Sequence, residues 1–204
     1  MTYQPVTPFR RAVDAAVIEQ ITPAGAPLPE TPVNKWDVLR NLGPVRQSFG
    51  LSDRALVVLQ ALLSFHPETD LGAGDGGMIV FPSNASICAR LNGMPCSTMR
   101  RHLADLVRAG LILRRDSPNG KRFARRGQGE LLAFGFDLTP LVRRADEIAE
   151  RAEEARAAEE QLRRLRLSVS VMRRDLAGLG EWLREQQGDD QMTRNALRLA
   201  GETA

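Results

Sequence analysis

The chain of 204 residues has few of the residues and segments that define several large protein classes. Its two cysteines are too few for the disulfide framework of a small secreted protein, and they fit a reducing compartment. No apolar run approaches the roughly 20 residues that a membrane-spanning helix requires, and the N-terminus lacks the apolar stretch of a secretory signal. With 43% hydrophobic residues, the chain can bury an ordinary core. We therefore expect a soluble cytoplasmic protein with no membrane partner.

Catalytic signatures are also missing. A phosphate-binding P-loop has Gly-Lys followed by Ser or Thr, whereas residues 120–122 read Gly-Lys-Arg. A rolling-circle nickase requires a tyrosine nucleophile beside paired histidines, but the only tyrosine is Tyr3 and the two histidines form no pair. The spacing of Cys88, Cys96 and His102 matches no zinc-ligand pattern, and Cys88 is expected as a buried apolar residue. The sequence thus predicts a non-catalytic protein without metal or other cofactor.

Lysine is scarce as well, so arginine carries nearly all of the positive charge. The formal net charge of the chain is only +3, yet residues 100–126 contain nine basic residues against two acidic ones, a net +7. A basic patch on a nearly neutral chain is typical of a surface that faces a polyanion. Arginine matches phosphates and guanine edges with its planar fork of donors. A GC-rich genome, whose codons favour arginine, is an alternative explanation for the arginine bias itself.

Turn and helix signals divide the chain into four segments. Residues 1–33 contain six prolines and are expected to form a flexible tail. Residues 34–140 form the predicted domain, residues 141–187 a long amphipathic helix, and residues 188–204 a polar C-terminal tail.

Within residues 34–140 the pattern predicts helices and strands in the order of a winged helix. Ser52 and Ser83 stand at N-cap positions, and Gly93 stands where a left-handed residue would end a helix. The predicted helices cover 34–46 (ending near Gly43-Pro44), 53–66, 83–93 and 95–110, and the predicted strands cover 78–81, 111–113 and 131–138. The last two strands flank a long basic loop over residues 116–130. The expected fold class is therefore mostly α with a small β wing, a winged helix-turn-helix followed by a long C-terminal helix.

The long helix has the heptad pattern of a coiled coil. With Ile148 at an a position, apolar residues recur at the a positions 155, 162, 169, 176 and 183 and at the d positions 158, 165, 172 and 179. Only Arg151 breaks this pattern, although Gly178 and Gly180 weaken the far end by roughly 1 kcal/mol each. Residues 148–183 are therefore expected to mediate self-association. The alternative is that this stripe packs on the first helix of the chain's own domain.

The candidate DNA-binding residues lie on the second helix of the helix-turn-helix and in the wing. The N-terminal part of such a helix enters the major groove, which predicts contacts to DNA from Ser97, Thr98, Arg100 and Arg101. Basic residues of the wing would follow the phosphate backbone or enter the minor groove, namely Lys121, Arg122, Arg125 and Arg126. His102, one turn later on the helix, either touches a phosphate or lies on the surface without a role. For the wing, the alternative is a solvated run of charge.

Four runs of sequence carry a family resemblance. They are LSDRALVVLQALLSFHPET (51–69), IVFPSNASICARLNGM (79–94), STMRRHLADLVRAGLILRRDSPNGKRFARRG (97–127) and AFGFDLTPLVRRADEI (133–148). They resemble the N-terminal portion of the RepC family, the replication initiators of repABC plasmids in alphaproteobacteria. HPET, VFPSN, RRDSPNGKR and FGFDL are the specific motifs, and the resemblance covers residues 35–175.

The resemblance implies binding to double-stranded origin DNA, which in this family is A·T-rich and lies within the initiator's own coding region. Origin opening and recruitment of the host replication machinery would follow. Family members continue into a second, C-terminal domain, so this chain is expected to be a truncated part of a longer initiator. The alternative is a shortened relative that retains DNA binding without full initiation. The alternative function is a winged-helix transcriptional repressor, although no ligand or metal pocket is visible in the sequence. A winged helix that binds only protein is disfavoured by the +7 segment.

Overall fold

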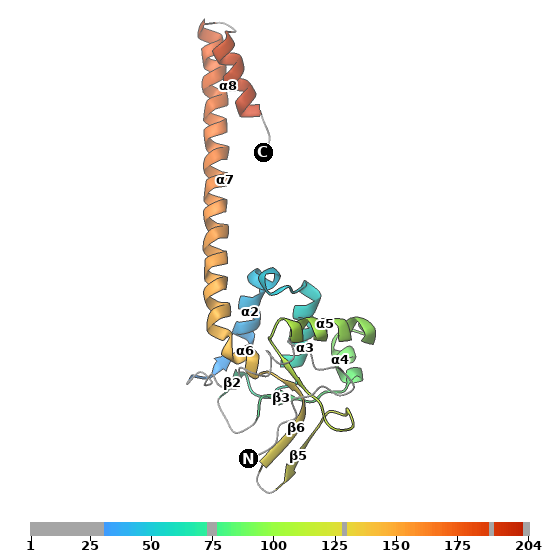
Figure 1. Cartoon of the computed structure of the whole chain (residues 1–204). Coiled ribbons are helices and arrows are strands. Elements are labelled where there is room, and N and C mark those ends of the chain that lie inside the picture. The colour runs from blue at the N-terminus through green and yellow to red at the C-terminus, as the bar shows by residue number, and fades with distance from the viewer. Residues whose placement is uncertain (1–30, 73–76, 128–129, 188–189, 202–204) are drawn as a thin grey trace. The chain divides into compact units, whose positions relative to one another are not determined.

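The computed structural model describes residues 31–72, 77–127, 130–187 and 190–201 (Figure 1). The chain divides into two compact units, of which the first ends at Glu153 and the second begins at Glu154. Helices account for most of the described residues and the sheets are small, which confirms the mostly helical class. The tail expected over residues 1–33 lies outside the described residues, apart from residues 31–33.

The first unit begins with helices whose starts follow from their capping residues. They are α2 (Lys35–Val45), the 3-10 turn η1 (Arg46–Phe49) and α3 (Asp53–Leu63). The side chain of Asn34 accepts hydrogen bonds from the first amides of α2, and Ser52 caps α3 as its position predicts. The predicted end near Gly43-Pro44 is slightly early, because Pro44 lies inside the last turn of α2, where it removes a single hydrogen bond.

A short strand pair, which the sequence did not reveal, joins the start of α2 to the segment after α3. Strand β1 (Val33–Asn34) pairs antiparallel with β2 (Asp70–Leu71). The next side chain, Lys35, is buried, and its Nζ donates hydrogen bonds to the backbone oxygens of His66 (2.7 Å) and Glu68 (2.6 Å). Burial lowers the pKa of Lys35, while the charge of Glu68 opposes that shift. The lysine thus holds the two segments together through carbonyl groups.

Helices α4 (Asn84–Arg90) and α5 (Cys96–Arg108) are joined by a tight turn. Ser83 caps α4 by accepting a hydrogen bond from the Ser86 amide (3.0 Å), as predicted. In the turn, Asn92 and Gly93 have φ angles of 51° and 78°, in the left-handed region that these two residue types adopt most readily. Both helices pack on α3, and Cys88 is buried as expected, together with Ile87, Leu91, Met99, Leu103 and Leu106.

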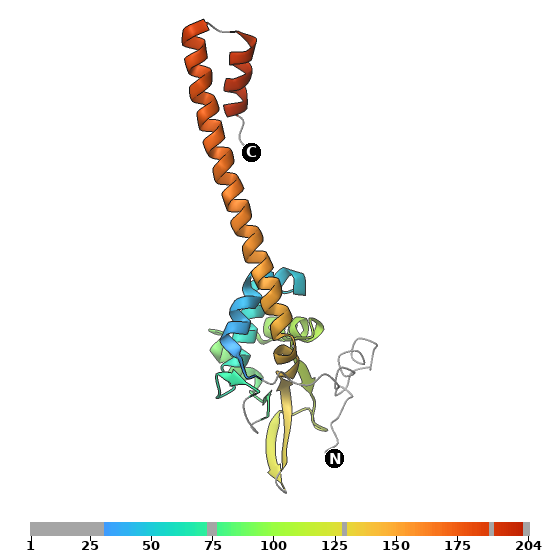
Figure 2. The same cartoon turned by 90° about the vertical axis from the view of Figure 1, so that its left-hand side faces the viewer.

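The main sheet is built around its longest strand. Its members are β3 (Ile79–Val80), β4 (Leu113–Arg115), β5 (Phe123–Gly127) and β6 (Glu130–Asp137). Strand β6 lies between β3 and β4 at its C-terminal end and pairs with β5 along the rest of its length (Figure 2). The prediction of a loop over residues 116–130 is therefore wrong for the residues that form β5. There the rings of Phe123 and Phe134 pack with centroids 5.2 Å apart, which favours pairing over an open loop.

The backbones of β6 and β3 approach most closely at Gly135. A Cβ at this position would collide with the backbone oxygen of Val80 and lie 3.1 Å from the Cα of Phe81. The next residue, Phe136, is fully buried. Glycine is therefore required here by the space between the strands.

A break separates the sheet from the long helix. The short helix α6 (Thr139–Arg143) precedes α7 (Ala145–Gln187), so the single helix predicted from residue 141 is interrupted at Arg144. The guanidinium of Arg144 donates hydrogen bonds to the backbone oxygen of Ala109 (2.6 Å) and to Glu147 (2.7 Å). Ile148 and Ala152, in the first turns of α7, are fully buried in the first unit.

In the second unit, the later part of α7 lies beside helix α8 (Gln191–Gly201) (Figure 2). A Cβ at Gly180 would lie 3.2 Å from the side chain of Leu197, and Arg173 donates a hydrogen bond to the backbone oxygen of Ala200 (2.9 Å). Asp190 accepts a hydrogen bond from the Thr193 amide, and this bond lowers the pKa of the Asp190 carboxyl. Most of the expected polar tail, residues 188–204, is thus a capped helix that packs on α7.

Candidate nucleic-acid interface

Helix α5 has one face in the core and one face in solvent. Met99, on the core side of the helix, is fully buried. Ser97, Arg100 and Arg101 are exposed, and Thr98 is half-buried. Within the described ranges, no hydrogen bond or ion pair holds Arg100 or Arg101. The two guanidinium groups are therefore available to a ligand in solvent.

The N-terminus of α5 adds to the positive character of this face. The N-cap residue is Pro95, and its side chain makes no capping hydrogen bond. The N-cap side chain therefore satisfies none of the first backbone N–H groups of the helix. The helix dipole also places partial positive charge at this end. Ser97 and Thr98 lie in this first turn.

The structure contradicts both interpretations of His102. Its side chain is buried, so it neither reaches a phosphate nor lies on the helix surface. Its Nδ1 lies 3.5 Å from a carboxylate oxygen of Asp105, and neither ring nitrogen has a hydrogen-bond partner among the described residues. His102 is on the core side of α5 because it follows Met99 at a spacing of three residues.

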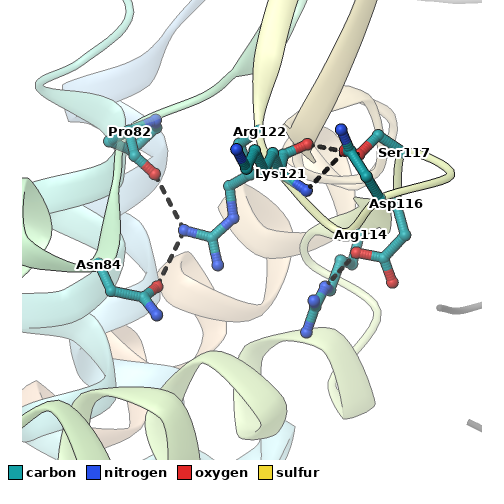
Figure 3. Close-up of polar contacts among 8 residues, drawn as sticks. Pro82, Asn84, Arg114, Asp116, Ser117, Lys121 and Arg122 are labelled. Carbon is teal, nitrogen blue, oxygen red and sulfur yellow. Dashed lines mark hydrogen bonds and ion pairs between the residues drawn. The ribbon is translucent and has the colours of Figure 1, made fainter. Parts of the chain in front are cut away.

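Arg122 occupies a different environment from the arginines of α5. Its Nη1 donates hydrogen bonds to the backbone oxygen of Pro82 (2.9 Å) and to the side-chain oxygen of Asn84 (3.0 Å) (Figure 3). The guanidinium carbon lies 4.3 Å from the ring centre of Phe136. This side chain links the segment before β5 to the first turn of α4.

Two further arginines of the basic segment are neutralised by carboxylates. Arg114 pairs with Asp116 at 2.6 Å (Figure 3), and Arg115 pairs with the buried Asp137 at 2.5 Å. The carboxylate of Asp137 also accepts a hydrogen bond from the backbone amide of Thr139 (2.9 Å). Sequence reasoning missed Asp137 as a partner because it lies 22 residues further along the chain.

The remaining wing residues lie on the outside or in the sheet. Lys121 and Arg125 are exposed, and Arg126 belongs to β5, where it is in register with Leu131. The turn before β5 is held by Ser117, whose hydroxyl donates a hydrogen bond to the backbone oxygen of Lys121 (2.6 Å).

Three arginines from different elements come close enough to repel one another. Burial, followed by the positive charges of Arg114 and Arg100, lowers the pKa of Arg122 to about 10, while Asp116 opposes the shift. With a pKa of about 10, Arg122 still carries its positive charge at neutral pH. Like charges gathered with incomplete compensation favour the binding of an anion. Arg114, which was not among the candidate DNA-binding residues, contributes to this cluster although it pairs with Asp116.

None of the helices in the described residues is long and apolar enough to cross a membrane. In the same ranges, no three His, Cys, Asp or Glu side chains gather in an arrangement that could hold a metal ion.

Comparison with known proteins gives a family match over most of the chain. The model of a family described as the replication protein C N-terminal domain matches residues 10–184. A protein of Sinorhizobium fredii (strain NBRC 101917 / NGR234), named "Putative replication protein C", is 46% identical over 178 residues, which are 86% of this chain and 44% of the relative. A protein of the same name from Rhizobium rhizogenes is 43% identical over 176 residues, 85% of this chain and 43% of the relative. The chain thus spans less than half the length of these relatives, and no solved structure matches it significantly.

Proposed function

The chain belongs to the replication protein C N-terminal domain family, and from this premise we propose that it binds double-stranded DNA at a plasmid origin to initiate replication. The binding is sequence-specific, and the chain contributes no catalysis. The origin is A·T-rich, and the bound protein serves to recruit the host replication machinery. The site of action is the cytoplasm.

The order and pairing of elements in the first unit support a winged helix. Helix α3, strand β3, helices α4 and α5 and strands β4 to β6 follow one another in the order of that fold. Antiparallel pairing of β6 with both β3 and β4 is the sheet arrangement expected when β4 to β6 form the wing. In this fold α5 is the helix that enters the major groove.

The observation that carries the proposal is the uncompensated positive charge on the outer face of α5. Arg100 and Arg101 are exposed with no partner in the described part of the chain, and Arg100 lies close enough to Arg122 to affect its ionisation. A protein gains nothing in stability from holding like charges together, whereas a polyanion such as DNA relieves their repulsion.

The geometry supports a division of roles among the candidate residues. Arg100 and Arg101 would read base edges in the major groove, because a guanidinium group matches the acceptors of guanine. Ser97 and Thr98 lie at the N-terminus of α5, where amide donors bind phosphate oxygens. Lys121, Arg125 and Arg126 would follow the phosphate backbone. Arg122 would not contact the phosphate backbone, as the sequence led us to expect, but would hold the wing against α4.

Footprinting of the chain on DNA that encodes it tests the proposal. A promoter fragment and a shuffled duplex of the same A·T content serve as controls. Protection confined to a segment of the coding region is the expected result, and log affinity should fall steeply with log salt concentration because phosphate contacts release counterions. Equal protection of the shuffled duplex, or affinity that does not respond to salt, would refute specific origin binding. Protection of the promoter alone would favour the repressor.

Self-association is proposed for the part of the α7 face over residues 148–183 that is exposed, because Ile148, at the start of this range, is buried in the first unit. Large apolar residues at a and d positions of the heptad are 46–68% exposed there, namely Leu162, Leu165, Val169, Met172 and Leu179. Helix α8 covers a neighbouring face around Gly180, so it leaves the d positions open. A second copy would bury them as a coiled coil. Sedimentation of the Leu165→Glu/Met172→Glu variant should give half the mass of the wild type, and equal masses would refute the proposal.

A further inference from the structure

The two cysteines of the chain meet across the turn between α4 and α5. The Sγ atoms of Cys88 and Cys96 lie 2.8 Å apart, with both thiols reduced. A disulfide bond requires an Sγ separation of about 2.05 Å, so the bond needs only a small approach of two groups already in contact. The two cysteines are also close in the sequence, where eight positions separate them.

The two thiols differ in accessibility. Cys88 is buried on the inner side of α4, whereas Cys96 is the exposed first residue of α5. The hydrogen bond between the thiols and, after it, burial raise the pKa of the Cys88 thiol. A reagent from solvent therefore meets Cys96 first and finds Cys88 as a protonated thiol behind it.

The surroundings of the pair are positively charged. The charge of Arg100 acts on the Cys88 thiol, and Arg100 and Arg101 are exposed on the same helix as Cys96. Such a field attracts anionic reagents and raises their local concentration.

We propose that Cys88 and Cys96 form a reversible oxidation site that reacts with an anionic low-mass disulfide such as oxidised glutathione. The thiolate of Cys96 attacks one sulfur of the reagent, a mixed disulfide forms, and one glutathione thiolate leaves and takes up a proton. Cys88 then loses its proton and attacks the Cys96 sulfur, which releases the second glutathione. The protein pair gives up two electrons and two protons, and the reagent becomes two molecules of reduced glutathione.

The product joins α4 to the first turn of α5 covalently. It closes the turn that contains Asn92 and Gly93, so it restricts the unfolded chain and stabilises the first unit. The disulfide also protects Cys96 from irreversible oxidation to the sulfinic and sulfonic acids.

Mass spectrometry of the whole chain after treatment with oxidised glutathione tests the site without any DNA. The mass of the wild type should fall by two hydrogens, with no glutathione attached, and a non-reducing gel should show no intermolecular links. The oxidised protein should also unfold at a higher denaturant concentration than the reduced protein, and a reducing agent should reverse this change. Cys88→Ala should stop at a glutathione adduct on Cys96, because the second thiol is missing. Cys96→Ala should stay unmodified while folded. A lasting adduct or a linked dimer of the wild type, or modification of Cys88 in the folded Cys96→Ala variant, would refute the site.

A charge variant tests the class of reagent. Arg100→Ala should slow oxidation by glutathione disulfide several-fold more than oxidation by the neutral hydroxyethyl disulfide. Equal slowing of both reactions would refute the preference for an anionic disulfide. Because these measurements contain no DNA, failure of the thiol site and failure of origin binding are separate results.

Discussion

Helix α5 and the segment from β4 to β5 are both rich in arginine, yet they use these side chains in opposite ways. On α5, Arg100 and Arg101 stand in solvent without partners among the described residues. In the other region, Arg115 pairs with the buried Asp137 and Arg122 is bound to Pro82 and Asn84. A count of charge along the sequence treats these groups alike, whereas only the unpaired ones remain for a ligand.

This difference assigns two kinds of role to one basic segment. Under the proposed function the arginines of α5 would contact DNA, whereas the arginines of β4 and the following turn are bound within the first unit, where they link its elements. Four variants, taken from the largest expected effect to the smallest, test whether the two regions differ in this way.

Removal of both exposed arginines of α5 should have the largest effect. Arg100→Ala/Arg101→Ala is expected to lower affinity for the cognate duplex by about 100-fold or more, since an arginine that reads a base edge contributes about 1–3 kcal/mol. Stability should not change. Fluorescence anisotropy measures the affinity, and Arg163→Ala/Arg164→Ala on α7, which removes the same charge from exposed positions, is the control. Equal losses in both variants would mean that only net charge matters.

Loss of the buried carboxylate should destabilise the first unit strongly. Asp137→Asn leaves Arg115 without its ionic partner, and breaking such a pair costs about 3 kcal/mol. Denaturant unfolding measures this change. Asp105→Asn, which affects an ion pair with the exposed Arg108, should cost less than about 1 kcal/mol. If the two variants were equally stable, Arg115 would not be a structural residue.

Neighbouring residues 121 and 122 should respond in different assays. Arg122→Ala removes two hydrogen bonds and the contact with Phe136, and it should lower the free energy of unfolding by about 2 kcal/mol. Lys121→Ala should change stability by less than about 0.5 kcal/mol, because the side chain is exposed. An Arg122→Ala protein of unchanged stability that has lost DNA affinity would assign Arg122 to recognition after all.

The smallest effect is expected from the exposed cations of the wing. Lys121→Ala/Arg125→Ala should weaken binding by roughly tenfold on every duplex, and each lost contact should reduce the salt slope by about 1. Affinities measured at several salt concentrations on cognate and shuffled DNA give both quantities. A loss confined to the cognate duplex would place base recognition in the wing as well.

Much of the first unit could be predicted from local signals. Ser52 and Ser83 marked helix starts, Gly93 marked the turn, and the comparisons confirm the family that the sequence resembles. The partners of the arginines could not be predicted in the same way. The contacts of Arg115 with Asp137 and of Arg122 with Pro82 span 22 and 40 residues, so they depend on how the sheet folds.

Two secondary-structure errors have a related cause. Strand β5 was hidden because its run of charge is typical of a loop, and only pairing with β6 makes it a strand. Helix α8 was hidden because it is short and contains as many polar residues as apolar ones, and packing on α7 supplies the missing stability. Tertiary contact, rather than local preference, decides both segments.

The narrow space at Gly135 restricts which residues can occupy that position in the folded domain. Because even a methyl group would press on the Val80 carbonyl, a saturation library selected for folded protein should return glycine almost alone at codon 135. The surface codons for Lys121 and Arg125 should accept many replacements in the same selection. Deep sequencing of such a library would therefore identify the positions that folding alone constrains, without any prior assumption about the ligand.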